Sequence, residues 1–154
     1  MPKLLRLHTL PQDEQILRAG NQEIIFPLSK EIWDLIDDMK LTVRKAPGVG
    51  LAAPQVGRNL MLAIIHLEEF GMPAFALINP KIVSRSIKKT SMEEGCLSIP
   101  GKFGIVKRPA KVEVQGFTEE GRQVVLKADK LLAKVLQHEI DHLNGILICD
   151  KFEK

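Results

Sequence analysis

Residues 129–144, DKLLAKVLQHEIDHLN, combine the pattern of an amphipathic helix with residue types that bind metal ions. Asp129 is suited to the N-cap position, and Asn144 followed by Gly145 is a typical helix stop. The stretch therefore predicts a helix that begins and ends within it. Its apolar residues recur at the spacing of a helix buried along one face: Leu131, Leu132, Val135, Leu136, Ile140 and Leu143.

Two histidines and a glutamate in this helix form the pattern His138-Glu139-x-x-His142. Side chains four residues apart project from one face of a helix, so both imidazoles can reach one divalent metal. Glu139 lies between them, close enough to exchange a proton with water at that metal. Leu131 and Val135 share the histidine side of the helix, which turns both rings toward the core. Two core histidines bonded only to backbone carbonyls are the alternative interpretation.

A hydrolytic metal site of this type needs a third protein ligand and an open coordination position. The twelve residues after His142 contain no histidine, and Asp150 and Glu153 are the only carboxylates there. Cys96, in the upstream segment EEGCLSIP at 93–100, is the better candidate because a thiolate is a common ligand of such metals. A small buried apolar residue is the other interpretation of a free cysteine.

Three segments resemble, in order along the chain, the signature motifs of the peptide deformylases. They are GVGLAAPQVG at 48–57, EGCLS at 94–98 and QHEIDH at 137–142. The resemblance extends from about Leu4 to Phe152, and three motifs in one register argue against a chance match. It implies a metal-dependent hydrolase that removes the formyl group from the N-terminal formylmethionine of nascent polypeptides and releases formate.

The resemblance also implies a role for each matching residue. Cys96, His138 and His142 would be the metal ligands, and Glu139 would act as general base and then as general acid. The side-chain amide of Gln55 and the backbone N–H of Leu97 would donate hydrogen bonds to the developing oxyanion. Without the resemblance, Gln55 reads as an ordinary loop residue and Leu97 as part of a strand core.

Further residues are expected near the substrate. Gly50 and Leu51 would lie beside the peptide backbone, because a missing Cβ allows close approach. Leu51, Ile99 and Val135 are candidates for an apolar pocket that takes the methionine side chain, with core packing as the alternative. Two charged residues stay open: Arg108 either anchors a loop carboxylate or lies near the peptide, and Asp141 either orients a ligand imidazole or pairs with an arginine.

The resemblance implies one divalent metal ion per chain, characteristically Fe(II), with Ni(II), Co(II) or Zn(II) as substitutes. Residue types alone do not choose among these metals. Nascent N-formylmethionyl peptides are the implied partners, and the ribosome is a further one. However, the C-terminal helix that can help ribosome docking in many bacterial members has no counterpart before the chain ends at Lys154.

Other kinds of protein fit parts of the pattern. A metallopeptidase of the HExxH type would cleave ordinary amides, and a third ligand at Cys96 argues against it. A catalytically idle metal- or peptide-binding protein would have no use for Glu139 or Gln55. A cysteine–histidine hydrolase would need a thiolate that is free of metal. The segment GVGLAA also matches a dinucleotide-binding fingerprint, but a predicted helix precedes it and Pro54 follows it, where a strand and a helix are required.

Composition is that of a small globular protein. The chain has 154 residues, 45% of them hydrophobic and 27% charged, which predicts a single catalytic domain over 1–154. A net charge of +3 with dispersed basic residues argues against direct DNA binding. No apolar stretch approaches the length of a signal peptide or membrane span. With Cys96 on a metal, the two cysteines fit a reducing, cytoplasmic environment.

The expected fold class is α+β, with two main helices packed with several small antiparallel β-sheets, as in the peptide deformylases. The helices are expected at 29–45 and 129–144. Strands are expected at 60–66, 75–78, 81–87, 96–99, 111–117, 123–127 and 145–149. Those at 111–117 and 123–127 should form a hairpin around Glu119-Glu120-Gly121.

Overall fold

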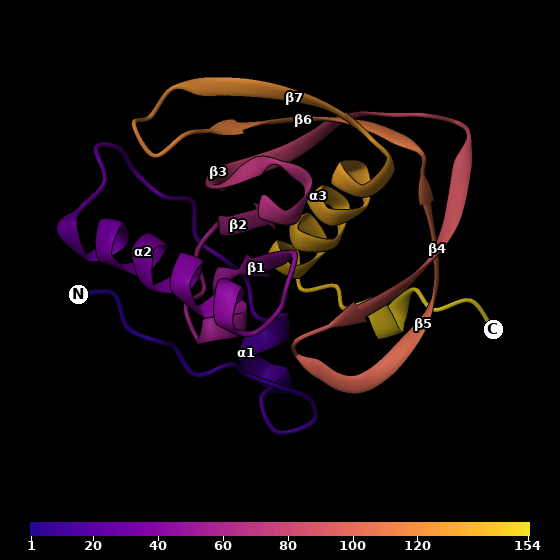
Figure 1. Cartoon of the computed structure of the whole chain (residues 1–154), viewed down its shortest axis with the longest axis horizontal. Helices are drawn as coiled ribbons and strands as arrows, with labels where there is room; N and C mark the ends of the chain where they lie inside the picture. The colour runs from indigo at the N-terminus through magenta and orange to yellow at the C-terminus, as the bar shows by residue number, and fades with distance from the viewer.

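A five-stranded antiparallel sheet and a separate two-stranded hairpin organise the protein, seen here in a computed structural model that describes residues 1–154 (Figure 1). The large sheet has the order β1-β2-β3-β6-β7, and β4 pairs with β5. The strands are β1 Gly50–Ala52, β2 Leu62–Leu67, β3 Met72–Arg85, β4 Lys89–Cys96, β5 Ile99–Pro109, β6 Lys111–Phe117 and β7 Gln123–Asp129. The α-helices are α1 Glu14–Arg18, α2 Lys30–Lys45 and α3 Lys130–Leu143, and short 3-10 turns are η1 Ala53–Val56, η2 Glu68–Phe70 and η3 Ile148–Asp150.

Strand β2 lies between two hydrophobic cores, one on each face of the large sheet, and contributes side chains to both. Its residues alternate between the faces, as the period of a strand requires. Leu62 and Ile64 belong to the core that contains the buried face of α2, whereas Ile65 and Leu67 belong to the core that contains α3. Because β2 is covered on both sides, its sequence LAIIHL is apolar at every position except His66 instead of alternating.

The two long helices are where the sequence predicts them. Ser29 caps α2, since its side-chain hydroxyl accepts a hydrogen bond of 3.2 Å from the Ile32 N–H. Helix α3 ends at Leu143 with Asn144 as its C-cap, and the next residue, Gly145, has a φ of +75°, which suits glycine. Asp129 occupies the N-cap position of α3, but its side chain makes no capping hydrogen bond. The α+β fold class with two main helices is confirmed.

The hairpin of β4 and β5 corrects the strand expected at 96–99. Strand β4 ends at Cys96, Leu97 and Ser98 form the connecting turn, and β5 begins at Ile99. The cysteine therefore lies at the tip of a long hairpin rather than inside a short strand. The strands expected at 75–78 and 81–87 are one strand, β3, in which the pairing with β6 shifts register between Ile78 and Lys81.

The strand expected at 145–149 is wrong. After the left-handed Gly145 the chain forms no strand: η3 occupies Ile148–Asp150, and beyond it Phe152 makes a single bridge to Val106 of β5. The apolar side chains that suggested a strand, Leu147 and Ile148, instead pack with Leu17 of α1 in a small core of their own. Their hydrophobicity is satisfied by this packing without any pairing along a sheet edge.

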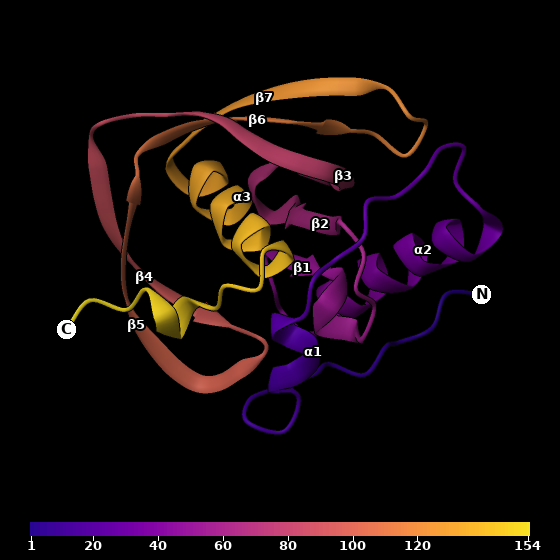
Figure 2. The same ribbon diagram turned by 180° about the vertical axis from the view of Figure 1, so that it is seen from behind.

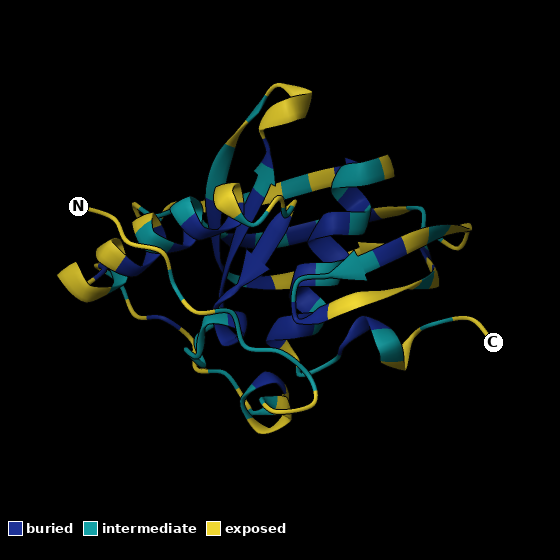
Figure 3. Ribbon diagram, turned by 60° about the horizontal axis from the view of Figure 1, so that its bottom comes forward, coloured by how far each residue is buried: buried dark blue, intermediate teal, exposed yellow.

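The resulting layers enclose α3 between the large sheet and the β4–β5 hairpin, in the views from both sides (Figures 1 and 2). Buried residues concentrate in the central strands and in α3, whereas exposed residues lie on the outer turns of α2 and at loop tips (Figure 3). No helix combines the length and the apolar character needed to cross a membrane. The inner position of α3 places its histidines opposite the hairpin tip.

Candidate metal centre

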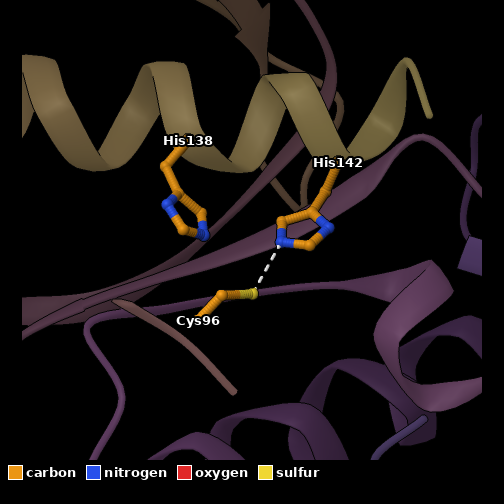
Figure 4. Close-up of side chains that lie close together, drawn as sticks. All are labelled: Cys96, His138 and His142. Carbon is orange, nitrogen blue, oxygen red and sulfur yellow. Dashed lines mark hydrogen bonds between the residues drawn. The ribbon is translucent and has the colours of Figure 1, made fainter. Parts of the chain in front are cut away.

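The hairpin tip and α3 bring one cysteine and two histidines together. Ligand atoms of Cys96, His138 and His142 all lie within 4.8 Å of one another. The distance from Cys96 Sγ to His142 Nε2 is 3.1 Å, and the two imidazole rings have centroids 5.1 Å apart. Figure 4 shows both rings projecting from one side of the helix toward the sulfur. This arrangement follows from the four-residue spacing of the histidines, because one helical turn places them on the same face.

Local packing fixes the position of the cysteine. Gly95 precedes it in β4, and a Cβ at this position would collide with the ring of Phe103 in β5. The strand pairing also shifts register between Gly95 and Cys96, where the chain enters the turn. A glycine before the cysteine therefore lets the hairpin close tightly at its tip.

His138 is held from behind by a buried charged network. Its Nδ1 lies 3.1 Å from Glu94 Oε1, so Nε2 is the nitrogen left to face the cysteine. Arg108 donates to both oxygens of Glu94, over 2.6 and 2.9 Å, and donates to Asp141 Oδ2 over 2.8 Å. The side chains of Glu94 and Arg108 are 1% and 6% exposed, so solvent hardly screens this pair.

These contacts resolve the two alternatives that the sequence leaves open. Arg108 anchors the carboxylates of Glu94 and Asp141, and Asp141 pairs with an arginine rather than with a histidine. The role of Glu94 is not evident from the sequence, although it stands two residues before the cysteine. Its partners are Arg108 of β5 and His138 of α3, and no spacing in the sequence predicts these contacts.

The electrostatics of the cluster place a proton on His138 and none on His142. Burial disfavours a charged His138, but Cys96 and Glu94 beside it raise the pKa of its imidazole to about 10. For Glu94, burial is outweighed by His138 and Arg108, which lower the pKa of its carboxyl to about 2. Burial lowers the pKa of His142 well below its ordinary value, which keeps this imidazole neutral and able to coordinate a metal.

Glu139 is buried directly beside the cluster. Its Oε1 lies 3.9 Å from His138 Nε2, and its Oε2 is buried without a hydrogen-bond partner. Burial raises the pKa of this carboxyl to about 7, against the opposing influence of His138 and Arg108. Gly50 of β1 makes room for it, because a Cβ there would lie 2.7 Å from Glu139 Oε1. A carboxyl in this state can both accept and release a proton near neutral pH.

Gln55 and Leu97 lie next to the cysteine, Gln55 in space and Leu97 along the chain. Gln55 is 1% exposed and is held at both ends of its amide. Its Oε1 accepts a hydrogen bond of 2.9 Å from the Ala52 N–H, and its Nε2 donates to Ser98 Oγ over 3.1 Å. The same Nε2 lies 3.7 Å from Cys96 Sγ. The backbone N–H of Leu97 has no acceptor within the protein.

A cavity of about 420 Å³ opens onto this cluster. Not every residue expected at the substrate lines it. The side chain of Leu51 is fully buried in the core beside α2, and Ile99 packs with Leu17 and Val106 in the small core. Among the expected residues, those in the lining are Gly50, Gln55, Cys96, Leu97, Val135, His138 and Glu139.

The donor set suits a divalent transition metal. One sulfur and two imidazole nitrogens converge from two separate elements, and several soft or borderline metals accept such ligands. Glu139 lies beside the same site, and its buried Oε2 has no hydrogen-bond partner. The cluster therefore could hold a single metal ion beside a cavity and a buried carboxyl.

An α+β fold with a cysteine–histidine–histidine cluster, a glutamate between the histidines and an adjoining cavity defines a metal-dependent hydrolase. The family model described as polypeptide deformylase matches residues 6–154. The chain therefore belongs to the polypeptide deformylase family, whose known function is removal of the formyl group.

Individual relatives agree with this assignment. A peptide deformylase of Syntrophobacter fumaroxidans is 50% identical over 152 residues, covering 96% of this chain and 86% of the relative. One from Halothermothrix orenii is 48% identical over 138 residues, covering 90% and 88%. The crystal structure of a Synechococcus elongatus peptide deformylase in complex with actinonin has a TM-score of 0.89 at 44% identity, covering 97% and 79%.

Proposed function

We propose that this protein hydrolyses the formyl group of N-formylmethionyl nascent peptides in the cytoplasm, with a single Fe(II) ion held by Cys96, His138 and His142. A divalent metal in this position would supply a Lewis acid that makes water nucleophilic near neutral pH. The observation that carries the proposal is Glu139, a buried carboxyl with an unpartnered oxygen beside the donor set and the cavity.

In this proposal Glu139 carries out both proton transfers of the reaction. Its carboxylate takes a proton from water as the new carbon–oxygen bond forms at the formyl carbon. The carbon–nitrogen bond then breaks, and Glu139 returns the proton to the departing amine of methionine. The products are formate and a peptide with a free N-terminus. A pKa near 7, caused mainly by burial, suits a group that must accept and then release a proton.

Two donors are proposed for the oxyanion that develops on the formyl oxygen. One is Gln55 Nε2, whose position is fixed by Ser98, and the other is the unbonded N–H of Leu97. Preorganised donors contribute about 2.7–4 kcal/mol each to lowering such barriers. Gly50 and Val135 border the same cavity, and we assign them to the peptide backbone and the methionine side chain respectively.

The test is formate release from a formyl-Met tripeptide under anaerobic conditions, with protein loaded with Fe(II) or Ni(II). The wild type should release formate, and Glu139→Gln, which keeps the shape of the side chain but not its proton chemistry, should lose nearly all of this activity. Acetylated and free-amino peptides serve as controls, because a general peptidase would cleave internal amides in them. A folded, metal-loaded wild type that released no formate would overturn the proposal.

A further inference from the structure

His66, near the end of β2, forms hydrogen bonds to Gly48 and Val49, which form one wall of the cavity. Its ring Nδ1 lies 2.7 Å from the carbonyl oxygen of Gly48. A carbonyl can only accept, so Nδ1 carries the hydrogen and donates it. The backbone N–H of His66 also donates to the Val49 carbonyl over 2.8 Å. Gly48 and Val49, whose carbonyls accept these two hydrogen bonds, both line the cavity.

The other side of the ring is fixed by a second pair of charged residues. His66 Nε2 lies 2.8 Å from Glu68 Oε1. Arg44, from the last turn of α2, donates to the two oxygens of Glu68 over 2.8 and 3.4 Å. The His66 side chain is only 15% exposed, so its ring has two bonds and little freedom to rotate. The imidazole is thus a rigid link between the helix end and the cavity wall.

The bond to Gly48 determines which way the next amide points. The Gly48 carbonyl and the Val49 N–H belong to one planar trans peptide, so they point in opposite directions. With the carbonyl turned toward β2, the Val49 N–H points to the opposite side, where β1 has no neighbouring strand. This N–H has no acceptor within the protein. Gly48 is also packed tightly, since a Cβ there would lie 2.9 Å from Leu97 Cδ1.

We propose that His66 is a positioning residue that holds the Val49 N–H toward the cavity as a hydrogen-bond donor for the backbone of the bound peptide. The inference rests on the proposed function, because the peptide is its substrate. His66 itself touches neither the three metal-binding candidates nor Glu139; it acts through the Gly48–Val49 peptide plane. Its effect therefore belongs to peptide binding rather than to the chemical step.

Three variants separate this role from a general contribution to folding. His66→Asn places an amide N–H near the position of Nδ1 and keeps the bond to Gly48, whereas His66→Gln places it near Nε2 and keeps only the contact with Glu68. His66→Ala keeps neither. We expect KM for a formyl-Met tripeptide to rise about tenfold in His66→Ala and His66→Gln, as for one lost hydrogen bond, with kcat within about twofold. His66→Asn should restore KM to within about twofold of the wild type.

Affinity for the deformylated tripeptide Met-Ala-Ser, measured by calorimetry on the metal-loaded protein, gives a readout that needs no turnover. Its Kd should follow the same order as KM across the variants. The inference is overturned if His66→Asn and His66→Gln behave alike, or if kcat falls while KM and Kd stay unchanged. A wild type that binds the tripeptide but releases no formate would instead contradict the proposed function, and the order of Kd values would still test His66.

Discussion

At the scale of single residues, Glu94 connects the candidate metal ligands to the rest of the protein. It touches His138 on one side and receives two hydrogen bonds from Arg108 on the other, in an almost fully buried position. Such partners fix the orientation of a ligand imidazole and usually affect metal affinity by about 10–100-fold. The motif EGCLS thus supplies a candidate ligand at its third residue and a support for another ligand at its first.

Replacing Glu94 with Gln should weaken both metal binding and folding. The amide cannot satisfy Arg108 and His138 together as an ionised carboxylate does, and breaking a buried ion pair costs about 3–5 kcal/mol. We expect metal affinity to fall by about 10–100-fold, measured by competition with a chelating dye. The loss of folding stability is measured as the change in the free energy of unfolding of the metal-free protein in urea. Unchanged values of both would show that the Glu94 network does not support His138.

Gly50 tests how much room Glu139 needs. A Cβ in Gly50→Ala would lie 2.7 Å from Glu139 Oε1, so the carboxyl must move away from its present position. Misplacement of a catalytic group by about 1 Å can cost about 10²-fold in rate, and we expect a loss of this order in kcat. Metal content should stay near that of the wild type, because no metal-binding candidate is touched.

The matched control for this change is Gly20→Ala. Nothing lies within 4 Å of a Cβ at Gly20, so the added methyl group meets open space. This variant should keep the kcat of the wild type in the same formate assay. An equal loss in both variants would point to a general effect of glycine replacement, and an unimpaired Gly50→Ala would contradict the assigned position of Glu139.

At the scale of elements, the long helices were the most predictable parts. Their apolar residues recur at helical spacing, and each buries one face against the sheet, so local pattern and tertiary packing agree. The sequence does not predict the β4–β5 hairpin, because its first strand, KTSMEEGC, is polar and exposed along much of its length and so lacks an apolar pattern. Strand β1 was missed as well, since Gly50 and Ala52 have little intrinsic preference for strands.

The residues of the site likewise divide into those that the sequence predicts and those that it does not. The cysteine, the histidines and Glu139 could be grouped from their motifs, because residue type and spacing carry the chemistry. Glu94, Arg108 and His66 act through contacts between segments far apart in the chain, which no local pattern reveals. Ile99 is a related case: an apolar residue three positions after the cysteine can face either the cavity or the core, and it packs in the core.

The two helix starts give a prediction at this scale. Ser29 accepts a hydrogen bond from Ile32 at the start of α2, whereas Asp129 makes none at the start of α3. Ser29→Ala should therefore lower the free energy of unfolding by about 1 kcal/mol. Asp129→Ala should cost less, because only the interaction of its charge with the helix dipole is lost. Urea unfolding of both variants checks the order, and a larger loss for Asp129→Ala would contradict it.

At the scale of the whole molecule, an ion pair joins segments from the two ends of the chain. Arg18 of α1 donates to both carboxylate oxygens of Asp150 in η3, over 2.8 and 2.9 Å, and to the carbonyl of Gly145 over 3.2 Å. Asp150 in turn accepts from the Leu147 N–H over 3.0 Å. The pair thereby fastens the segment after α3 to α1, over the small core of Leu17, Leu147 and Ile148.

This pair predicts a pH dependence of stability. The hydrogen bond from Arg18 is the main cause that lowers the pKa of Asp150 below its ordinary value of 3.8. A carboxyl with a lowered pKa binds fewer protons in the folded state than in the unfolded state, so it stabilises the fold above its ordinary pKa. That contribution is lost as the pH falls below 3.8 through the folded-state value. Both side chains are about one-third exposed, which limits the contribution at pH 7 to about 1 kcal/mol or less.

Removing Arg18 should therefore lower the stability of the fold at neutral pH, and lower it less in acid. We expect Arg18→Gln to lower the free energy of urea unfolding at pH 7, and the difference from the wild type to shrink as the pH is lowered below 3.8. Lys30→Gln is the matched control, since it removes one positive charge from an exposed pair with Asp34 whose side chains are 89% and 58% exposed. This control should show a smaller difference at pH 7. A difference for Arg18→Gln that stayed constant or grew toward low pH would show that Arg18 stabilises the protein through packing against α1 and not through the charge of Asp150.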